Sequence, residues 1–134
     1  MWLARFSDKV RLHLGKVLSA DFVPFFGHRL ATDGTFLNFF KLDLPTVLEA
    51  VRNHTTDTEL EAWFLLQPGV GADRIAAWNQ LGPKLGRPGE PMERAFSYAR
   101  RKYYGGENAH PGVISVFTGI AWDEGYLDQL PPLT

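Results

Sequence analysis

A chain of 134 residues is close to the commonest size of a single domain and is too short for two independent hydrophobic cores. Apolar residues make up 45% of the chain and charged residues 22%, which excludes a disordered chain, a collagen-like repeat and a coiled coil. The sequence contains no cysteine, so it cannot form a disulfide framework, an iron–sulfur cluster or a cysteine nucleophile. We therefore expect one soluble domain over residues 1–134.

The same sequence features indicate where the protein works. No stretch is apolar over the ~20 residues that a membrane span requires, so we expect no membrane partner. The first residues carry charges every few positions and lack the apolar centre of a signal peptide. A chain without cysteine also fits a reducing compartment. We expect a cytoplasmic protein.

Charge is distributed unevenly, although the formal net charge is only −1. Segment 84–104 carries six basic and two acidic residues, whereas segment 43–73 carries one basic and six acidic residues. From residue 105 to the end there are four acidic residues and no basic ones. Such asymmetry is found at surfaces for nucleic acid or acidic partners. The near-neutral total favours the alternative, in which basic segments fold against acidic ones.

The first predicted element is an amphipathic helix, which Gly15 weakens near its end. Its apolar residues recur every three or four positions, which places them on one face while most charged residues lie elsewhere. This apolar stripe consists of Leu3, Phe6, Val10, Leu14 and Val17.

Segment 21–42 holds six of the ten phenylalanines. Pro24 and Gly27 interrupt regular structure, and Asp33 followed by Gly34 is a turn signal. We interpret the segment as an irregular connection whose aromatic side chains fill the core from both ends. Its last part, residues 35–41, fits a short helix or a hydrophobic plug.

Further helices are predicted from capping signals and from helical spacing. Asp43 and Pro45 are typical of a helix start, and Thr56 with Glu59 has the pattern of a capping box. Apolar residues recur at helical spacing in two later segments. We predict helices over about 43–53, 56–67, 73–81 and 90–104, the last opened by Glu90 and Pro91 and ended by Gly105 and Gly106.

Segment 113–117 is rich in β-branched residues and fits a strand, but Pro111 before it fits the first residue of a helix. No second strand candidate of comparable strength exists, so a helix is favoured and both alternatives stay open. The predicted fold is mainly α: a compact single-domain bundle of about six or seven helices with irregular, aromatic-rich connections. The expected aromatic core consists of Phe6, Phe22, Phe25, Phe36, Phe40, Trp63, Trp78 and Phe96.

Motifs for metal, cofactor or nucleophilic chemistry are absent from the sequence. The four histidines, at positions 13, 28, 54 and 110, have no metal-ligand spacing. There is no serine-nucleophile elbow, no phosphate-binding lysine loop and no dinucleotide fingerprint. The glycine-rich residues 69–73 follow a predicted helix and lack a lysine, so we interpret them as a connection. We expect no metal and no cofactor, name no catalytic residue, and leave open whether the protein is an enzyme.

Residues 27–34 form the most site-like stretch. Histidine is the residue type whose charge changes near neutral pH, and His28 supplies one here. Arg29 can hold a carboxylate or phosphate, and Asp33 can orient either of the two side chains. Polar groups among phenylalanines are typical of a small-ligand pocket. In the alternative interpretation, which is favoured, Asp33 caps a helix that starts one or two residues later, and the other two side chains bind loop carbonyls.

Two acidic residues, Asp123 and Glu124, are candidates to complete this ligand site. They follow Trp122, and adjacent carboxylates point in different directions on a helix or turn. The favoured alternative is structural: one of them pairs with Arg94 or Arg101, while the aromatic neighbours attach this segment to the core.

Arg100, Arg101 and Lys102 form a run of three cations beside Tyr103 and Tyr104. Cations next to aromatic rings are typical of sites for single-stranded nucleic acid or an acidic partner. Cations in the last turn of a helix also complement the helix dipole, and this solvated-end interpretation is favoured.

Three stretches in combination resemble a known family: WLARFSDKVRL at 2–12, FGHRLATDGTFL at 26–37 and TDTELEAWF at 56–64. WDEG at 122–125 is also similar. They resemble the bacterial family called domain of unknown function 5069, over nearly the whole chain. The resemblance implies a small bacterial cytosolic protein and implies no activity or catalytic residue. The family pattern places a few more residues before Trp2, in agreement with the abrupt helical start.

The leading functional hypothesis is a non-enzymatic binding module with a protein partner or a homo-oligomer. The first alternative is a small-ligand-binding protein or enzyme with a polar site around residues 27–34, taking a small anion. The second, less favoured alternative is RNA or ribosome association through residues 100–102.

Overall fold

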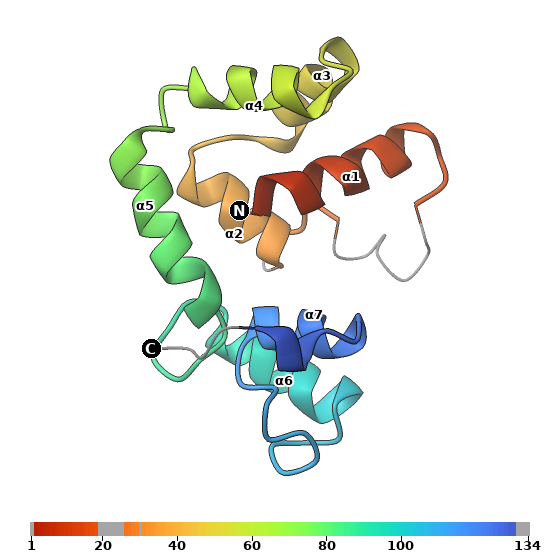
Figure 1. Ribbon diagram of the computed structural model, residues 1–134, viewed down its shortest axis with the longest axis vertical. Helices are drawn as coiled ribbons and strands as arrows, with labels where there is room; N and C mark the ends of the chain where they lie inside the picture. The colour runs from red at the N-terminus through yellow and green to blue at the C-terminus, as the bar shows by residue number, and fades with distance from the viewer. Residues whose placement is uncertain (1, 19–25, 30, 131–134) are drawn as a thin grey trace. The chain divides into compact units, whose positions relative to one another are not determined.

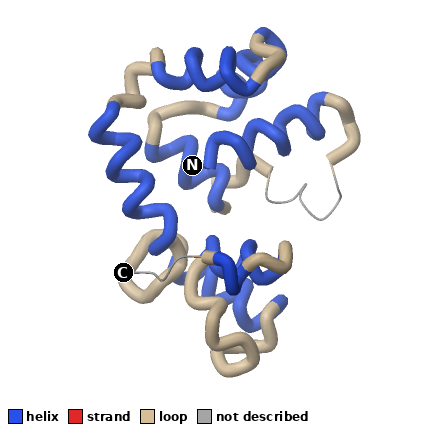
Figure 2. The backbone as a smooth tube through the Cα atoms, in the orientation of Figure 1, coloured by secondary structure: helices blue, strands red, loops and turns tan. Residues whose placement is uncertain are grey.

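The computed structural model describes residues 2–18, 26–29 and 31–130. Within these residues it contains seven α-helices, two short 3-10 helices and no strand (Figures 1 and 2). The prediction of a mainly helical fold with six or seven helices is therefore confirmed. In chain order the α-helices are α1 (Trp2–Leu14), α2 (Thr32–Phe39), α3 (Leu44–Asn53), α4 (Asp57–Leu65), α5 (Ala72–Leu81), α6 (Glu93–Tyr103) and α7 (Val116–Asp123).

The chain divides into two compact units, Met1–Trp78 and Asn79–Thr134. The first contains α1 to α4 and most of α5, and the second contains α6, α7 and the 3-10 helices η2 (Gly82–Lys84) and η3 (Leu127–Gln129). None of the helices within the described ranges combines the length and apolar character needed to cross a membrane.

Helix α1 buries the predicted apolar stripe only as far as the helix continues. Phe6 and Val10 are completely buried, whereas Val17 is exposed. The reason is local: Lys16 adopts a left-handed conformation (φ 59°), which no α-helix can contain. The chain therefore leaves the helix after Leu14, and the stripe ends there.

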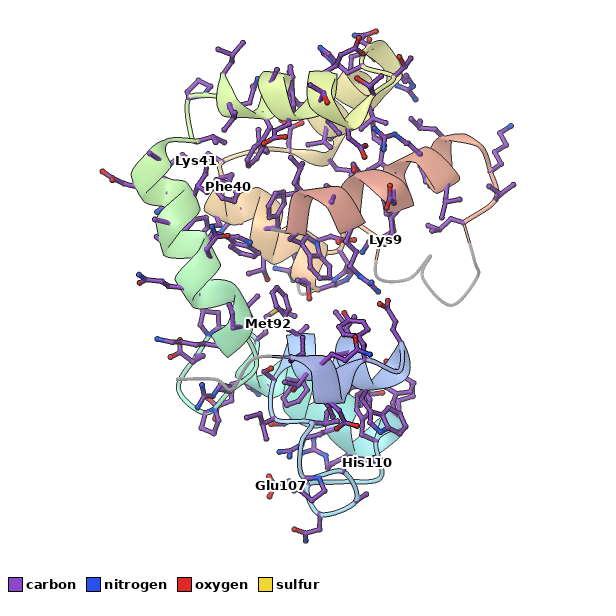
Figure 3. All side chains as sticks on the ribbon, in the orientation of Figure 1. Lys9, Phe40, Lys41, Met92, Glu107 and His110 are labelled. Atoms are coloured by element: carbon purple, nitrogen blue, oxygen red, sulfur yellow. The ribbon has the colours of Figure 1, made fainter. Side chains whose placement is uncertain are left out.

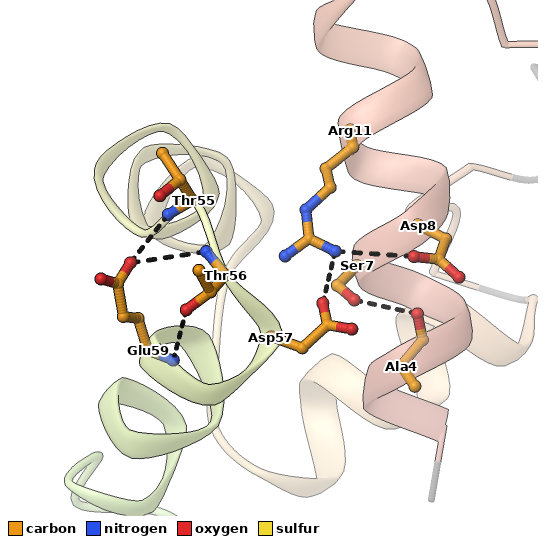
Figure 4. A network of polar contacts seen from close by, with 8 residues as sticks. All are labelled: Ala4, Ser7, Asp8, Arg11, Thr55, Thr56, Asp57 and Glu59. Carbon is orange, nitrogen blue, oxygen red and sulfur yellow. Dashed lines mark hydrogen bonds and ion pairs between the residues drawn. The ribbon is translucent and has the colours of Figure 1, made fainter.

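Local capping fixes the starts of α3 and α4, as predicted. The Asp43 carboxylate accepts a hydrogen bond from the Thr46 amide at 2.8 Å. Thr56 and Glu59 form the reciprocal capping box (Figure 4). The same view shows the Arg11 guanidinium of α1 paired with the Asp57 carboxylate of α4. The nitrogen and oxygen of this ion pair lie 2.6 Å apart.

Aromatic rings form the core of the first unit. Phe36 lies 5.1 Å from Phe40, 5.9 Å from Phe64 and 5.3 Å from Trp78, measured between ring centroids. Ring pairs at these separations contribute beyond their burial, about 0.5–1.5 kcal/mol each. Of the predicted aromatic core, Phe6, Phe36, Phe40, Trp78 and Phe96 are buried, Trp63 is half-buried, and Phe22 and Phe25 lie outside the described residues.

The second unit differs from the predictions at two helix starts. Helix α6 begins at Glu93 rather than at Glu90, because Met92 is left-handed (φ 68°) and separates the preceding turn from the helix. Within the described residues, segment 113–117 is not a strand, and Pro111 does not begin a helix. Ser115 instead caps α7, with its hydroxyl accepting a hydrogen bond from the Thr118 amide.

Candidate functional site

The stretch at 27–34 is organised around the buried carboxylate of Asp33, whose side chain is 1% exposed. Its Oδ1 accepts a hydrogen bond from the Trp2 indole at 2.8 Å. Lys9 Nζ lies 2.6 Å from both carboxylate oxygens, and the Gly27 amide donates to Oδ2 at 3.2 Å. Three donors therefore engage this carboxylate, as a buried anion requires.

This arrangement corrects the expectation that Asp33 caps a helix. Helix α2 begins at Thr32, and its N-cap is Ala31, whose side chain makes no capping hydrogen bond. Asp33 is the second residue of the helix, and its carboxylate binds residues of α1 and of the preceding loop. The capping interpretation was wrong because the helix begins before Asp33, and two of the three donors, Trp2 and Lys9, come from distant parts of the chain.

Gly34 fixes the loop against α2. A Cβ atom built on Gly34 would lie 2.2 Å from the His28 carbonyl oxygen and 2.4 Å from the Arg29 Cα. Only glycine permits so close an approach of two backbones. The close contact at Gly34 and the hydrogen bond from Gly27 explain the spacing of this motif without invoking a ligand.

Lys9 is the residue at this centre that sequence reasoning missed (Figure 3). Its side chain is 15% exposed, and burial lowers its pKa, while the charge and hydrogen bonds of Asp33 act in the opposite direction. The sequence did contain a signal for it. Trp2, Phe6 and Lys9 follow one another at helical spacing, so a cation lies within the buried stripe of α1.

His28 and Arg29 have exposed side chains. Their backbone packs closely against Gly34, and both side chains extend from this contact toward solvent. In the described part of the chain, Arg29 has no ion pair with a carboxylate. The three predicted ligand residues of this loop thus divide into a structural Asp33 and two solvent-facing side chains.

Asp123 and Glu124 lie in the second unit, at the last residue and the C-cap of α7. Asp123 Oδ2 accepts a hydrogen bond from the Tyr104 hydroxyl at 2.8 Å. Partial burial, followed by this hydrogen bond, raises the pKa of Tyr104. The Tyr104 ring also contacts Trp122, which His110 contacts at 4.3 Å between centroids. The Asp123 side chain thus joins the end of α6 to the end of α7.

The three cations at 100–102 lie on different faces of α6. The Arg100 guanidinium lies over the Phe96 ring, 5.6 Å from its centroid, and this side chain is half-buried. Arg101 and Lys102 are exposed. Because Phe96 and Arg100 are four residues apart, they share the inner face of the helix.

The outer face of α6 carries a group of exposed side chains that extends beyond residues 100–102. Arg94, Tyr98, Arg101 and Lys102 recur at spacings of three and four, and all four are exposed. The Lys102 ammonium lies 5.5 Å from the Tyr98 ring centroid and 5.2 Å from that of Tyr103. Hydrogen bonding with these two tyrosines raises the pKa of Lys102. We call the four residues of the outer face, together with the exposed Tyr103 at the last position of α6, the α6 surface (Arg94, Tyr98, Arg101, Lys102 and Tyr103).

Other parts of the described chain provide weaker candidates for a binding site. In the first unit a hollow of about 240 Å³ lies beside Lys41, Asp43 and Gln67. The Asp43 carboxylate there is already engaged as the cap of α3. No group of three metal-ligating side chains is found in the ranges that the structure describes.

The described elements of this protein are all helices. The first unit contains a buried carboxylate that is engaged by three donors, and the second contains a helix with exposed cationic and aromatic side chains. The chain belongs to the family described as a domain of unknown function (DUF5069), whose family model matches residues 1–126. The family resemblance stated from the sequence is thereby confirmed. Neither the curated proteins nor the solved structures contain a match to this chain.

Proposed function

We propose that this protein is a non-enzymatic binding module and that the α6 surface is the part that contacts its partner. The observation that carries the proposal is the exposure of Tyr98 and Tyr103, 56% and 55% respectively, with the Lys102 ammonium beside both rings. Tyrosine and arginine are the residue types that most often supply binding energy at protein interfaces.

The polar centre at Asp33 supports binding rather than catalysis. A general acid or base must reach the proton that it transfers, and a catalytic carboxylate keeps an oxygen for that purpose. The three donors from Trp2, Lys9 and Gly27 engage both oxygens of Asp33, which is itself almost fully buried. Asp33, which the sequence suggests as a ligand-binding residue, thus has a structural role available.

Site-specific photocrosslinking in the native cells tests the proposal. A photoreactive phenylalanine analogue is placed at position 98 on the α6 surface, and in a matched control at position 66, because Leu66 is 83% exposed on the other unit. We expect one defined crosslinked product from position 98 and none of that mass from position 66.

Charge reversal completes this experiment. Arg101→Glu with Lys102→Glu should abolish the product, whereas Lys41→Glu with Lys84→Glu changes the net charge equally at two exposed lysines elsewhere and should preserve it. Equal labelling from positions 98 and 66, or a product that survives reversal on α6, would contradict a specific role for the α6 surface.

A second candidate function is binding of a small anion by the loop at 27–34. Its support is Arg29, which is exposed and has no ion pair with a described carboxylate, on a loop fixed by Gly34. Phosphate should then raise the melting temperature of the native protein and not that of Arg29→Ala. Equal effects on both proteins would remove this candidate.

We also propose that the module works in the cytoplasm of a bacterium. Support comes from the absence of cysteine and from the family resemblance described above. Fractionation of native cells should recover the protein with cytoplasmic enzymes. Recovery with a periplasmic or membrane fraction would contradict this location.

A further inference from the structure

The charge on the α6 surface is of one sign. Arg94, Arg101 and Lys102 are its charged members, and no ion pair joins any of them to a carboxylate of the described residues. Lys102 follows Arg94 by eight positions, so these cations extend over about 12 Å along the helix. A partner that covers this surface must bring negative charge, because burying three cations without counter-charges is costly.

The tyrosines add an apolar component to the same surface. Each ring is more than half exposed, and Lys102 lies beside both of them. Tyr98 lies within the positive group, since it follows Arg94 by four residues and precedes Lys102 by four. The complementary partner therefore carries carboxylates or phosphates and also a group that packs on an aromatic ring.

Two classes of macromolecule meet that description: nucleic acid and an acidic protein segment. The net charge of the unit distinguishes them. Residues 79–134 contain six basic and six acidic residues, so the unit that carries the α6 surface is neutral overall. Nucleic-acid-binding domains are usually strongly basic because a polyphosphate chain interacts with the whole domain. A short acidic protein segment needs only the local positive surface.

We propose that the partner of the α6 surface is an acidic protein segment in which carboxylates flank an apolar side chain. This inference rests on the proposed function and names the chemistry of its partner. Two carboxylates of the partner that lie about 12 Å apart can reach Arg94 and Lys102 at the same time. This distance corresponds to about four residues of an extended chain or eight residues of a helix. The apolar side chain between them packs on Tyr98.

Fluorescence anisotropy with two defined probes tests the proposal. One probe is a labelled 12-residue peptide that repeats glutamate, glutamate, leucine, and the other is a labelled 20-nucleotide uridine RNA. We expect the full-length protein to bind the peptide more tightly than the RNA, with an affinity that falls as salt rises from 50 to 200 mM. The same peptide with glutamine in place of glutamate should bind at least about tenfold more weakly.

Variants of the protein locate the binding. Arg101→Glu with Lys102→Glu, and the milder Arg101→Gln with Lys102→Gln, should each weaken peptide binding at least about tenfold. Tyr98→Ser should weaken it without changing its salt dependence. Lys41→Glu with Lys84→Glu should leave the affinity within about twofold, because that change lies outside the α6 surface. Circular dichroism checks that each variant keeps the helical content of the native protein.

The possible failures are distinguishable. Tighter binding of the RNA, lost on charge reversal of α6, would overturn the acidic-protein partner and leave the α6 surface as the binding site. Failure of both probes, with the crosslink at position 98 intact, would overturn the partner chemistry alone. Failure of both probes together with loss of any specific crosslink would overturn the binding function as well.

Discussion

Asp33 is a charged residue among aromatic side chains, and the structure shows why it is tolerated there. Its carboxylate lies 2.6 Å from Lys9 Nζ and also accepts hydrogen bonds from Trp2 and Gly27. A buried ion pair of this kind contributes little net stability compared with apolar residues of the same volume. Removing one member of the pair, in contrast, lowers stability strongly. The remaining buried charge still carries its desolvation cost but no longer has an opposite charge to attract it.

We therefore expect Asp33→Asn to lower the free energy of unfolding by about 3 kcal/mol, because it leaves the Lys9 ammonium almost buried beside a neutral amide. Urea denaturation followed by circular dichroism measures the change. Asp128→Asn is the matched control, since Asp128 is exposed in η3, and should change the free energy by less than about 0.5 kcal/mol. Equal effects of the two substitutions would show that the Asp33 centre is not structural.

The close packing around Gly34 gives a second prediction about a single residue. A methyl group there would lie 2.2 Å from the His28 carbonyl oxygen, so Gly34→Ala must push the loop away from α2. We expect a loss of about 3 kcal/mol in the free energy of unfolding. Gly71→Ala is the control, because a Cβ on Gly71 has no atom of the described chain within 4 Å. A Gly34→Ala variant as stable as Gly71→Ala would contradict the close contact.

Individual helices of this protein are largely fixed by residues within one turn of their ends. Thr56 and Glu59 start α4, Asp43 starts α3, and the left-handed Lys16 closes the turn that follows α1. Such signals depend on backbone hydrogen bonds between near neighbours, so the sequence reveals them. The start of α6 shows the limit: Glu90 and Pro91 looked like a helix start, but left-handed Met92 delays the helix to Glu93.

The hydrogen bond from Tyr104 to Asp123 joins α6 to α7 and makes their association depend on pH. Burial and this hydrogen bond raise the pKa of Tyr104 above its ordinary value of 10.0. The folded protein therefore keeps the phenol proton at pH values where the unfolded chain has lost it. The stability from this bond is fully present below pH 10 and decreases as the pH rises above 10.

Urea denaturation at several pH values between 9 and 12 tests this consequence. Native protein should lose stability more steeply above pH 10 than Tyr104→Phe, because phenylalanine does not ionise. Tyr98→Phe is the matched control, since Tyr98 is exposed, and it should follow the native profile. Identical slopes for native protein and Tyr104→Phe would contradict a raised pKa at this position.

At the scale of the whole molecule, the sequence predicts one domain, and the contacts divide the chain into two compact units at Trp78. Each unit buries its own residues: Phe6, Phe36 and Phe64 in the first, Leu85 and Val113 in the second. The boundary falls within α5, a continuous helix from Ala72 to Leu81. One domain over residues 1–134 therefore stays a prediction.

Hydrogen exchange in increasing urea tests whether the units unfold together. We expect the most protected amides near Phe64 in the first unit and near Ala121 in the second to reach the same global free energy of opening. Two distinct free energies, each with its own dependence on urea, would show two independently unfolding domains.

Sequence alone determined the helical class, most helix positions and much of the aromatic core, because helical periodicity and capping act over three or four residues. That Arg100 packs on Phe96 could also have been read from their spacing of four. Only the tertiary structure decided the role of Asp33, whose partners Trp2 and Lys9 lie 31 and 24 residues away. It also decided which polar side chains stay exposed. The role of Asp33 and the exposure of polar side chains both depend on contacts between chain segments that are far apart in the sequence. Local sequence patterns do not reveal such contacts.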